Sequence, residues 1–150
     1  MGLSDDIKSS KFNSQKSKAM VNILFTHNWF RDIFKVTLKK YDLLPQHYNV
    51  LRIVKGKFPE PITPGEIKNV MLDKGPDVTR LMDKLVKMDL VNRCQDEENR
   101  RVVQIRMNEK GLELLTHINK EMEVIENNSF GLSEDEARLL SDLLDKSRIK

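Results

Sequence analysis

The chain of 150 residues contains a single cysteine and lacks any long run of apolar residues. One cysteine, Cys94, excludes an internal disulfide and predicts a reducing compartment. No apolar stretch approaches the ~20 residues that cross a bilayer, and residues 1–18 lack the apolar segment of a signal peptide. These absences predict a cytoplasmic protein with no membrane partner.

Side chains in catalytic or metal-binding arrangements are scarce as well. The three histidines, His27, His47 and His117, show no metal-ligand spacing, so each is interpreted as a core or surface residue. Paired carboxylates, a nucleophile arrangement and a glycine-rich phosphate loop are all missing. The sequence therefore predicts no enzyme activity, no cofactor and no metal. Cys94 is interpreted as a small packed residue, with redox sensing as the alternative.

Charge is distributed unevenly along the chain. Residues 1–41 hold 8 basic and 3 acidic side chains, whereas residues 108–150 hold 6 and 10. A basic front and an acidic tail are compatible with a nucleic-acid partner. Residues 63–107 are nearly neutral, with 9 basic and 8 acidic side chains, so DNA binding would depend on where the charges lie.

Apolar periodicity predicts long helices at both ends of the chain. Residues 1–14 are polar and are expected to form a flexible arm. Apolar residues at spacings of three and four predict one long helix over 15–41. Asn108 is expected to cap a second long helix, and a capping box at Ser133 predicts a last helix. These helices carry more apolar surface than a small domain can cover, which predicts a homodimer.

The middle of the chain has the pattern of a helix-turn-helix followed by a hairpin. Helices are predicted over 45–54, 64–72 and 76–88, and strands over 90–94 and 101–107. The second helix begins at a capping box and is expected to bury Ile67, Val70 and Met71. A three-residue turn, 73–75, joins it to the third helix, which is expected to begin at Pro76. A hairpin in this place is a wing.

Basic residues form a stripe, Arg80, Lys84 and Lys87, on the third of these helices. Such a stripe is often only a solvated face, but a helix-turn-helix with a wing favours DNA contact. Thr79, Arg80 and Asp83 are predicted to reach base edges in the major groove. Lys84 and Lys87 are predicted to contact phosphates.

Two arginines lie at the predicted tip of the wing. Arg100 and Arg101 are predicted to lie over the minor groove, with an ordinary polar hairpin tip as the alternative. The acidic residues 96–98 would repel phosphate unless they turn away or pair with the arginines. The capped start of the helix over 64–72 is expected to offer backbone amides to a phosphate.

The order of these elements and the residues within them resemble the MarR family of winged helix-turn-helix regulators. Residues 76–85 with 90–93 resemble the recognition helix and first wing strand, and residues 96–111 resemble the rest of the wing. Residues 132–136, followed by paired leucines, resemble the final dimerisation helix. The resemblance covers residues 15–147.

The resemblance implies a fold, a domain organisation and a function. The fold is mainly α with a small β-hairpin wing, in a single domain over 15–150. Its winged lobe spans about 45–107, and its dimerisation helices span about 15–41 and 109–147. The implied function is sequence-specific DNA binding as a dimeric repressor on a palindromic operator, released by a small aromatic ligand. Core packing is the alternative role for the residues that could line the ligand pocket, Phe25, Trp29, Phe30 and Tyr48.

Three residues depart from the family pattern. Asn99 stands where an Asp usually pairs with the wing arginine, and is expected to leave the tip less firmly held. Asp89 stands where a Gly usually ends the recognition helix, and Asp tolerates the left-handed backbone better than most residues. Asn108 stands in place of Thr, and both residues cap helices.

A function of another class is also open. A winged-helix protein that binds other proteins, without specific DNA binding, is favoured by the near-neutral charge of residues 63–107. DNA affinity that does not depend on salt concentration, or no affinity at all, would indicate this alternative.

Overall fold

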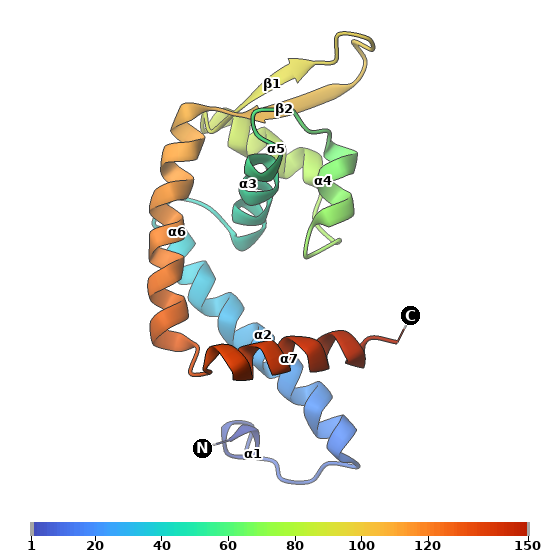
Figure 1. Cartoon of the computed structure of the whole chain (residues 1–150), viewed down its shortest axis with the longest axis vertical. Helices are drawn as coiled ribbons and strands as arrows, with labels where there is room; N and C mark the ends of the chain where they lie inside the picture. The colour runs from blue at the N-terminus through green and yellow to red at the C-terminus, as the bar shows by residue number, and fades with distance from the viewer. Residues whose placement is uncertain (1, 150) are drawn as a thin grey trace. The chain divides into compact units, whose positions relative to one another are not determined.

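The computed structural model describes residues 2–149 and is mainly helical, with one two-stranded antiparallel sheet in that range (Figure 1). The elements are α1 (Leu3–Asp6), α2 (Gln15–Lys39), α3 (Pro45–Lys57), α4 (Pro64–Val70), α5 (Val78–Lys87), β1 (Val91–Gln95), β2 (Val103–Met107), α6 (Glu109–Ser129) and α7 (Glu134–Ser147). This order confirms the fold predicted from the sequence. Contacts divide the chain into two compact units, Met1–Leu115 and Thr116–Lys150. The single domain over 15–150 stays a prediction.

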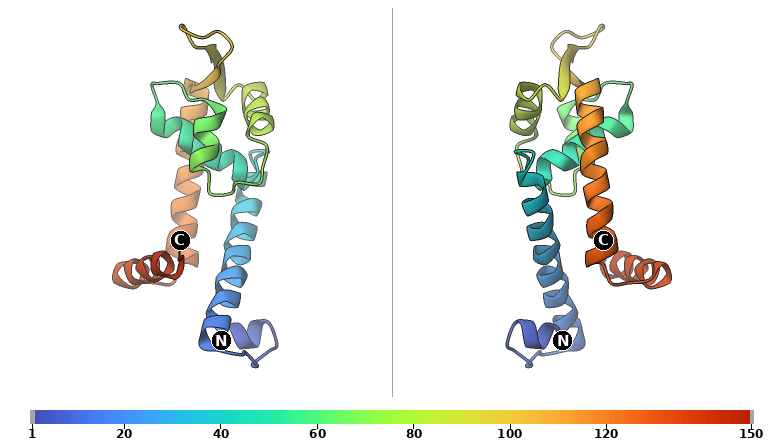
Figure 2. Two further views of the ribbon diagram at one scale, coloured as in Figure 1. Left: turned by 90° about the vertical axis from the view of Figure 1, so that its right-hand side faces the viewer. Right: turned by 90° about the vertical axis from the view of Figure 1, so that its left-hand side faces the viewer.

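A shared apolar core holds together the winged lobe, which comprises α3, α4, α5, β1 and β2. The side chains that are 0% exposed within it come from all three helices and from β2: Val50, Leu51, Val54, Ile67, Leu85 and Ile105. Helix α3 lies at the centre and contacts α2, α4, α5 and β2. Figure 2 shows the hairpin extending beyond these helices, at the end of the lobe away from α2.

Helix α2 is long and mostly uncovered. Ser14 caps it by accepting a hydrogen bond from the backbone N–H of Ser17 at 3.0 Å. Of its 25 residues, all of which the structure describes, only Leu38 is buried. Its exposed apolar side chains are Met20, Ile23, Leu24, Phe25, Trp29 and Val36.

The segment predicted to be a flexible arm contains the short helix α1. The backbone N–H of Gly2 donates to the Asp5 carboxylate at 3.0 Å, and Leu3 is buried. One turn of helix is too short to show an apolar period, which is why the sequence pattern did not indicate it.

The helix-turn-helix connection is longer than predicted. Helix α4 ends at Val70, and α5 begins at Val78 rather than at Pro76. The Asp77 side chain accepts from the backbone N–H of Arg80 at 3.4 Å, so Asp77 caps α5. The prediction of a three-residue turn was therefore wrong.

The end of α4 also differs from the prediction. Ile67 and Met71 are buried as expected, but Val70 is 60% exposed. Leu72, just beyond the helix, is 91% exposed. The helix ends earlier than its apolar pattern indicated, and its last residue, Val70, faces solvent instead of the core.

The wing is a regular hairpin that is anchored at its base. Val91 pairs with Met107 near the helices, and Gln95 pairs with Val103 towards the tip. Ile62, which precedes α4, donates to the Ile105 carbonyl at 2.8 Å and accepts from the Ile105 N–H at 2.9 Å. The start of α4 is therefore bonded directly to β2.

The second unit holds the end of α6 and all of α7. The predicted capping box is confirmed: the N–H of Glu136 donates to the Ser133 hydroxyl, and the N–H of Ser133 donates to the Glu136 carboxylate. No residue of α7 is buried, and Leu139 and Leu143 are more than half exposed. Across residues 2–149, no helix has the length and apolarity needed to span a membrane.

Candidate nucleic-acid interface

An open groove of about 580 Å³ lies between the start of α4, one side of α5 and the wing. Its lining residues are Thr63, Pro64, Gly65, Thr79, Met82, Asp83, Arg93, Arg101, Val102 and Val103. The apolar members form its walls, and two arginines come from the hairpin. The groove brings together the three elements that a winged helix-turn-helix uses to contact a duplex.

The structure separates the seven predicted DNA-binding residues into two groups. Thr79, Asp83 and Arg101 line the groove. The other four lie outside its lining: Arg80, Lys84, Lys87 and Arg100. Three of those four are exposed, and Lys84 is the exception.

Asp83 is engaged within the protein. Its carboxylate forms an ion pair with the guanidinium of Arg93 on β1, and both side chains are about half exposed. The pair joins the recognition helix to the wing, and it neutralises a carboxylate that would repel phosphate. The sequence reasoning missed Arg93. The alternation of the strand was the available signal, because it places Arg93 on the same face as the buried Val91.

Lys84 turns away from the groove. Its ammonium group lies 3.5 Å from the carboxylate of Asp42, in the turn between α2 and α3, and its side chain is 34% exposed. Asp42 has a left-handed backbone, with φ 56°. The ion pair fastens α5 to this turn, so the predicted contact of Lys84 with phosphate does not fit its position.

His47 lies next to this ion pair and is buried. Its Nδ1 accepts a hydrogen bond from the backbone N–H of Leu44 at 2.9 Å, which caps α3. Burial, together with the positive charge of Lys84, lowers the pKa of His47, while Asp42 acts in the opposite direction. The interpretation of His47 as a core histidine with a satisfied ring is confirmed.

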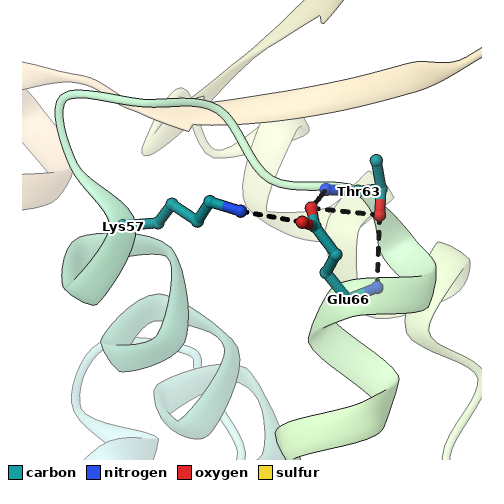
Figure 3. A network of polar contacts seen from close by, with 3 residues as sticks. All are labelled: Lys57, Thr63 and Glu66. Atoms are coloured by element: carbon teal, nitrogen blue, oxygen red, sulfur yellow. Dashed lines mark hydrogen bonds and ion pairs between the residues drawn. The ribbon is translucent and has the colours of Figure 1, made fainter.

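The start of α4 is held by a small polar network (Figure 3). The Thr63 hydroxyl accepts from the N–H of Glu66 at 3.2 Å, and the Glu66 carboxylate accepts from the N–H of Thr63 at 2.9 Å. Lys57 lies 2.7 Å from the same carboxylate and, with Thr63, holds the pKa of Glu66 below its ordinary value. Two of the amides expected to bind a phosphate are therefore already bonded within the protein.

The wing tip is held through its backbone. The Asp96 carboxylate accepts from the N–H groups of Glu98 at 2.8 Å and Asn99 at 3.1 Å, so it turns into the loop. The Asn99 side chain accepts from the N–H of Arg101 at 3.2 Å. Asn99 therefore bonds the backbone of the tip, and the expectation of a less firmly held tip stays a prediction.

The four residues predicted for a ligand pocket lie on two helices. On α2, the ring of Phe30 lies 4.8 Å from that of Trp29 and 6.2 Å from that of Phe34, and Phe25 is partly exposed. On α3, the guanidinium of Arg52 lies 5.8 Å from the ring of Tyr48. These are packing contacts within each helix, and the pocket stays a prediction.

Solved structures of known proteins share this fold. A MarR transcription factor from Planctomyces limnophilus is 29% identical with a TM-score of 0.70, covering 90% of this chain and 98% of that one. A mutant MarR from E. coli, complexed with operator DNA, is 22% identical with a TM-score of 0.72, covering 99% and 100%. Bordetella bronchiseptica BpsR, described in terms of the regulation of its DNA binding by 6-hydroxynicotinic acid, is 18% identical with a TM-score of 0.76, covering 94% and 100%.

Sequence comparison gives the family. An uncharacterized HTH-type transcriptional regulator of Bacillus subtilis, YpoP, is 27% identical over 79 residues, which are 53% of this chain. The match spans 55% of YpoP, about half of its length. The family described as transcriptional regulator SarA/Rot matches residues 32–118, more than half of the chain and the whole winged lobe. The chain therefore belongs to the SarA/Rot family of transcriptional regulators.

Proposed function

We propose that the chain binds double-stranded DNA in a sequence-specific manner, with α5 in the major groove and the wing over the adjacent minor groove. The observation that carries this proposal is the groove in which Thr79 of α5, Arg93 of β1 and Arg101 of the wing come together. The width of the major groove admits a helix of this kind, and the narrow minor groove attracts arginine. The protein acts in the cytoplasm as a regulator of transcription.

The structure supports a revised set of roles for the charged residues. Arg80 is the candidate bidentate donor to guanine, with Thr79 beside it on α5. Lys87 contacts a phosphate at the other end of the helix. Arg93 lines the groove, and the N–H groups of its guanidinium that are not bonded to Asp83 are candidates for a phosphate contact. Arg100 and Arg101 keep the role over the minor groove that is proposed for them from the sequence.

A homodimer follows from the apolar side chains that the long helices expose. On α2, Met20 and Leu24 are 66% and 64% exposed, and on α7 Leu139 and Leu143 are 59% and 54% exposed. Surfaces of this kind mark protein interfaces. A two-fold symmetric dimer presents two recognition helices, which predicts a palindrome with half-sites about one helical turn apart. The complex of the E. coli relative with operator DNA supports DNA binding by this fold.

A small aromatic ligand completes the proposal: it releases the protein from its operator, so that the protein acts as a repressor. Support comes from BpsR, whose DNA binding is regulated by an aromatic acid, and from the aromatic side chains of α2. Titration of aromatic acids into a protein–operator complex, followed by fluorescence anisotropy, tests this part. Unchanged affinity across the series would discard the ligand and leave DNA binding untouched.

Selection from random duplex DNA tests the main proposal. We expect an enriched palindrome, and an affinity for it that falls steeply as salt concentration rises because phosphate contacts release counterions. Binding without an enriched sequence would reject specificity.

A protein-binding module is the second candidate, favoured by Val70 and Leu72, which are exposed at the helix-turn-helix connection. No DNA affinity, or an affinity independent of salt, would support this second candidate instead.

A further inference from the structure

The turn between α5 and β1 is hydrogen-bonded to Asn108, the residue directly before α6, and to the first turn of α6. The Asn108 amide nitrogen donates to the backbone carbonyl of Asp89 at 2.8 Å and to the side-chain oxygen of Asn92 at 3.1 Å. The Asn108 side-chain oxygen accepts from the N–H of Gly111 at 2.8 Å and so caps α6. One side chain thus joins the end of the recognition helix, the first wing strand and α6.

Close backbone approach makes this grip possible. A Cβ atom on Gly111 would lie 2.0 Å from the carbonyl oxygen of Leu90, so only glycine allows the first turn of α6 to come so near. Lys110 adds a bond from its ammonium group to the carbonyl of Met88 at 3.2 Å. The turn is therefore bonded to α6 at several points along its length.

Two of the departures from the MarR pattern meet at this junction. Asp89, in place of the usual Gly, has a left-handed backbone with φ 58°, which is unfavourable for most residues with a Cβ atom. Asn108, in place of the usual Thr, bonds the carbonyl of Asp89 and lies 3.5 Å from its carboxylate. Asn108 therefore stabilises the left-handed backbone conformation that is unfavourable for Asp89.

The chemistry of the side chain explains why asparagine is needed. A carboxamide has two N–H donors and a separate oxygen, so it can bond Asp89, Asn92 and Gly111 at once. A threonine hydroxyl can still accept from Gly111 and cap α6, but it has only one donor. Threonine at position 108 would keep the cap and lose the bridge from α5 to β1.

We propose that Asn108 is a positioning residue for DNA binding, because it fixes the angle between the recognition helix and the wing. The inference rests on the proposed DNA-binding function. Asn108 lies outside the groove lining, so it acts through α5 and β1, which carry Thr79 and Arg93 into the groove.

The first test needs no DNA. Asn108→Thr, and Asn108→Ser as a second variant, are compared with Asn127→Thr, which changes an exposed asparagine of the same helix. Amide hydrogen exchange is measured at the wing strands and at Gly111. We expect wing amides to exchange about three- to tenfold faster in both position-108 variants, because a hydroxyl with one donor replaces an amide nitrogen that bonds both Asp89 and Asn92, while Gly111 stays protected. Unchanged exchange in the wing would overturn the proposal.

The second test uses an operator duplex. Arg101→Ala is introduced into the wild-type protein and into Asn108→Thr. Fluorescence anisotropy then gives the loss of operator affinity that Arg101→Ala causes in each of these two backgrounds. We expect this loss to be about two- to fivefold smaller in the Asn108→Thr background, because the wing no longer holds Arg101 against the duplex. A variant that only lowered stability would leave the loss unchanged. The double variant Asp89→Gly with Asn108→Thr has the family residues at both positions. In that background, Arg101→Ala is expected to lower operator affinity as much as it does in the wild-type background.

The outcomes separate this proposal from the proposed function. If the wild-type protein binds no duplex, the proposed function fails and the positioning role fails with it. If the wild-type protein binds and the loss caused by Arg101→Ala is equal in both backgrounds, only the positioning role is overturned.

Discussion

Most apolar residues of the winged lobe are buried, whereas most of those on the long helix α2 are exposed. In the lobe, leucines such as Leu51 and Leu85 are completely buried, and α3, α4, α5 and β2 all contribute to one core. In α2, only Leu38 is buried, although the helix is 25 residues long. The lobe closes its core within one chain, whereas α2 leaves most of its apolar side chains in contact with solvent.

The difference indicates that the two regions have different roles. A core that is closed within the chain fixes the relative positions of the groove residues. An uncovered apolar helix gains stability only when something covers it. The proposed homodimer supplies that cover, and the predictions below test this division.

The largest effect is expected inside the lobe. Leu85→Ala removes a fully buried side chain and should lower the free energy of unfolding by about 2–5 kcal/mol. Leu24→Ala, on α2, removes a side chain that is 64% exposed and should lower it by less than about 1 kcal/mol in the monomer. Urea unfolding at low protein concentration measures both. Equal losses would remove the contrast between the two regions.

Introducing charge on the uncovered helices should break the dimer. Leu24→Asp or Leu139→Asp is expected to weaken association by about 2–4 kcal/mol, because a central interface side chain is replaced by a carboxylate. Leu72→Asp is the matched control, since Leu72 is also exposed but lies on the lobe. Sedimentation equilibrium gives the dissociation constants. A wild-type protein that sediments as a monomer at micromolar concentration would refute the dimer.

At the proposed DNA-binding surface, Arg80→Ala on α5 and Arg101→Ala on the wing should each weaken operator binding by about 1–3 kcal/mol. Arg80→Ala is also expected to relax sequence preference, whereas Arg101→Ala should weaken binding broadly. Arg138→Ala, on α7, serves as the control because its arginine is exposed and pairs with Asp135. Gel-shift titration measures the affinities, and unchanged binding by both the Arg80 and the Arg101 variant would discard this site assignment.

Acidification should loosen the lobe at His47. The neutral ring accepts from the N–H of Leu44, and a protonated Nδ1 cannot. The pKa of His47 is lowered in the folded protein, so the unfolded chain binds the proton more readily. This stabilisation is complete above 6.5, the ordinary pKa of a histidine side chain, and is lost as pH falls from there through the lower pKa of the folded state.

Urea midpoints across that pH range measure the effect. His47→Gln should flatten this part of the pH dependence, because a glutamine oxygen can accept the same hydrogen bond at any pH. His117→Gln, at an exposed position, should leave the dependence as in the wild type. If the urea midpoint of His47→Gln still fell with pH as in the wild type, the effect would belong to another titratable group.

The smallest effect is expected at the network shown in Figure 3. Lys57→Met removes an ion pair whose two side chains are 43% and 46% exposed, so the loss in stability should be about 0.2–1 kcal/mol. Lys55→Met, an exposed lysine of the same helix, is the control. Thermal unfolding at low and high salt distinguishes the two, because only the Lys57 effect should shrink as salt rises.

Local signals in the sequence predicted the fold well. The capping boxes at Thr63 and Ser133 each join residues three apart, so the pattern contains the whole interaction. Asp89 was expected to take the left-handed backbone that ends α5, and it does. The helix that was predicted to begin at Pro76 begins at Val78 instead, directly after its side-chain cap Asp77.

The site was harder to predict because its charges pair across elements. Asp83 and Arg93 are ten residues apart and meet only because the wing folds back along α5. Lys84 and Asp42 meet only through the packing of α5 on the turn after α2. A periodic stripe cannot show which of its members already has a partner, so Lys84 was grouped with Arg80 and Lys87.

The bonds between Ile62 and Ile105 give β2 a neighbour on each side, β1 on one and the segment before α4 on the other. Exposed strand edges invite pairing with foreign strands, and such pairing leads to aggregation. At Ile105 the wing has no edge left to offer on the α4 side. The hairpin can therefore extend towards a partner while less of its edge is open to pairing with a second hairpin.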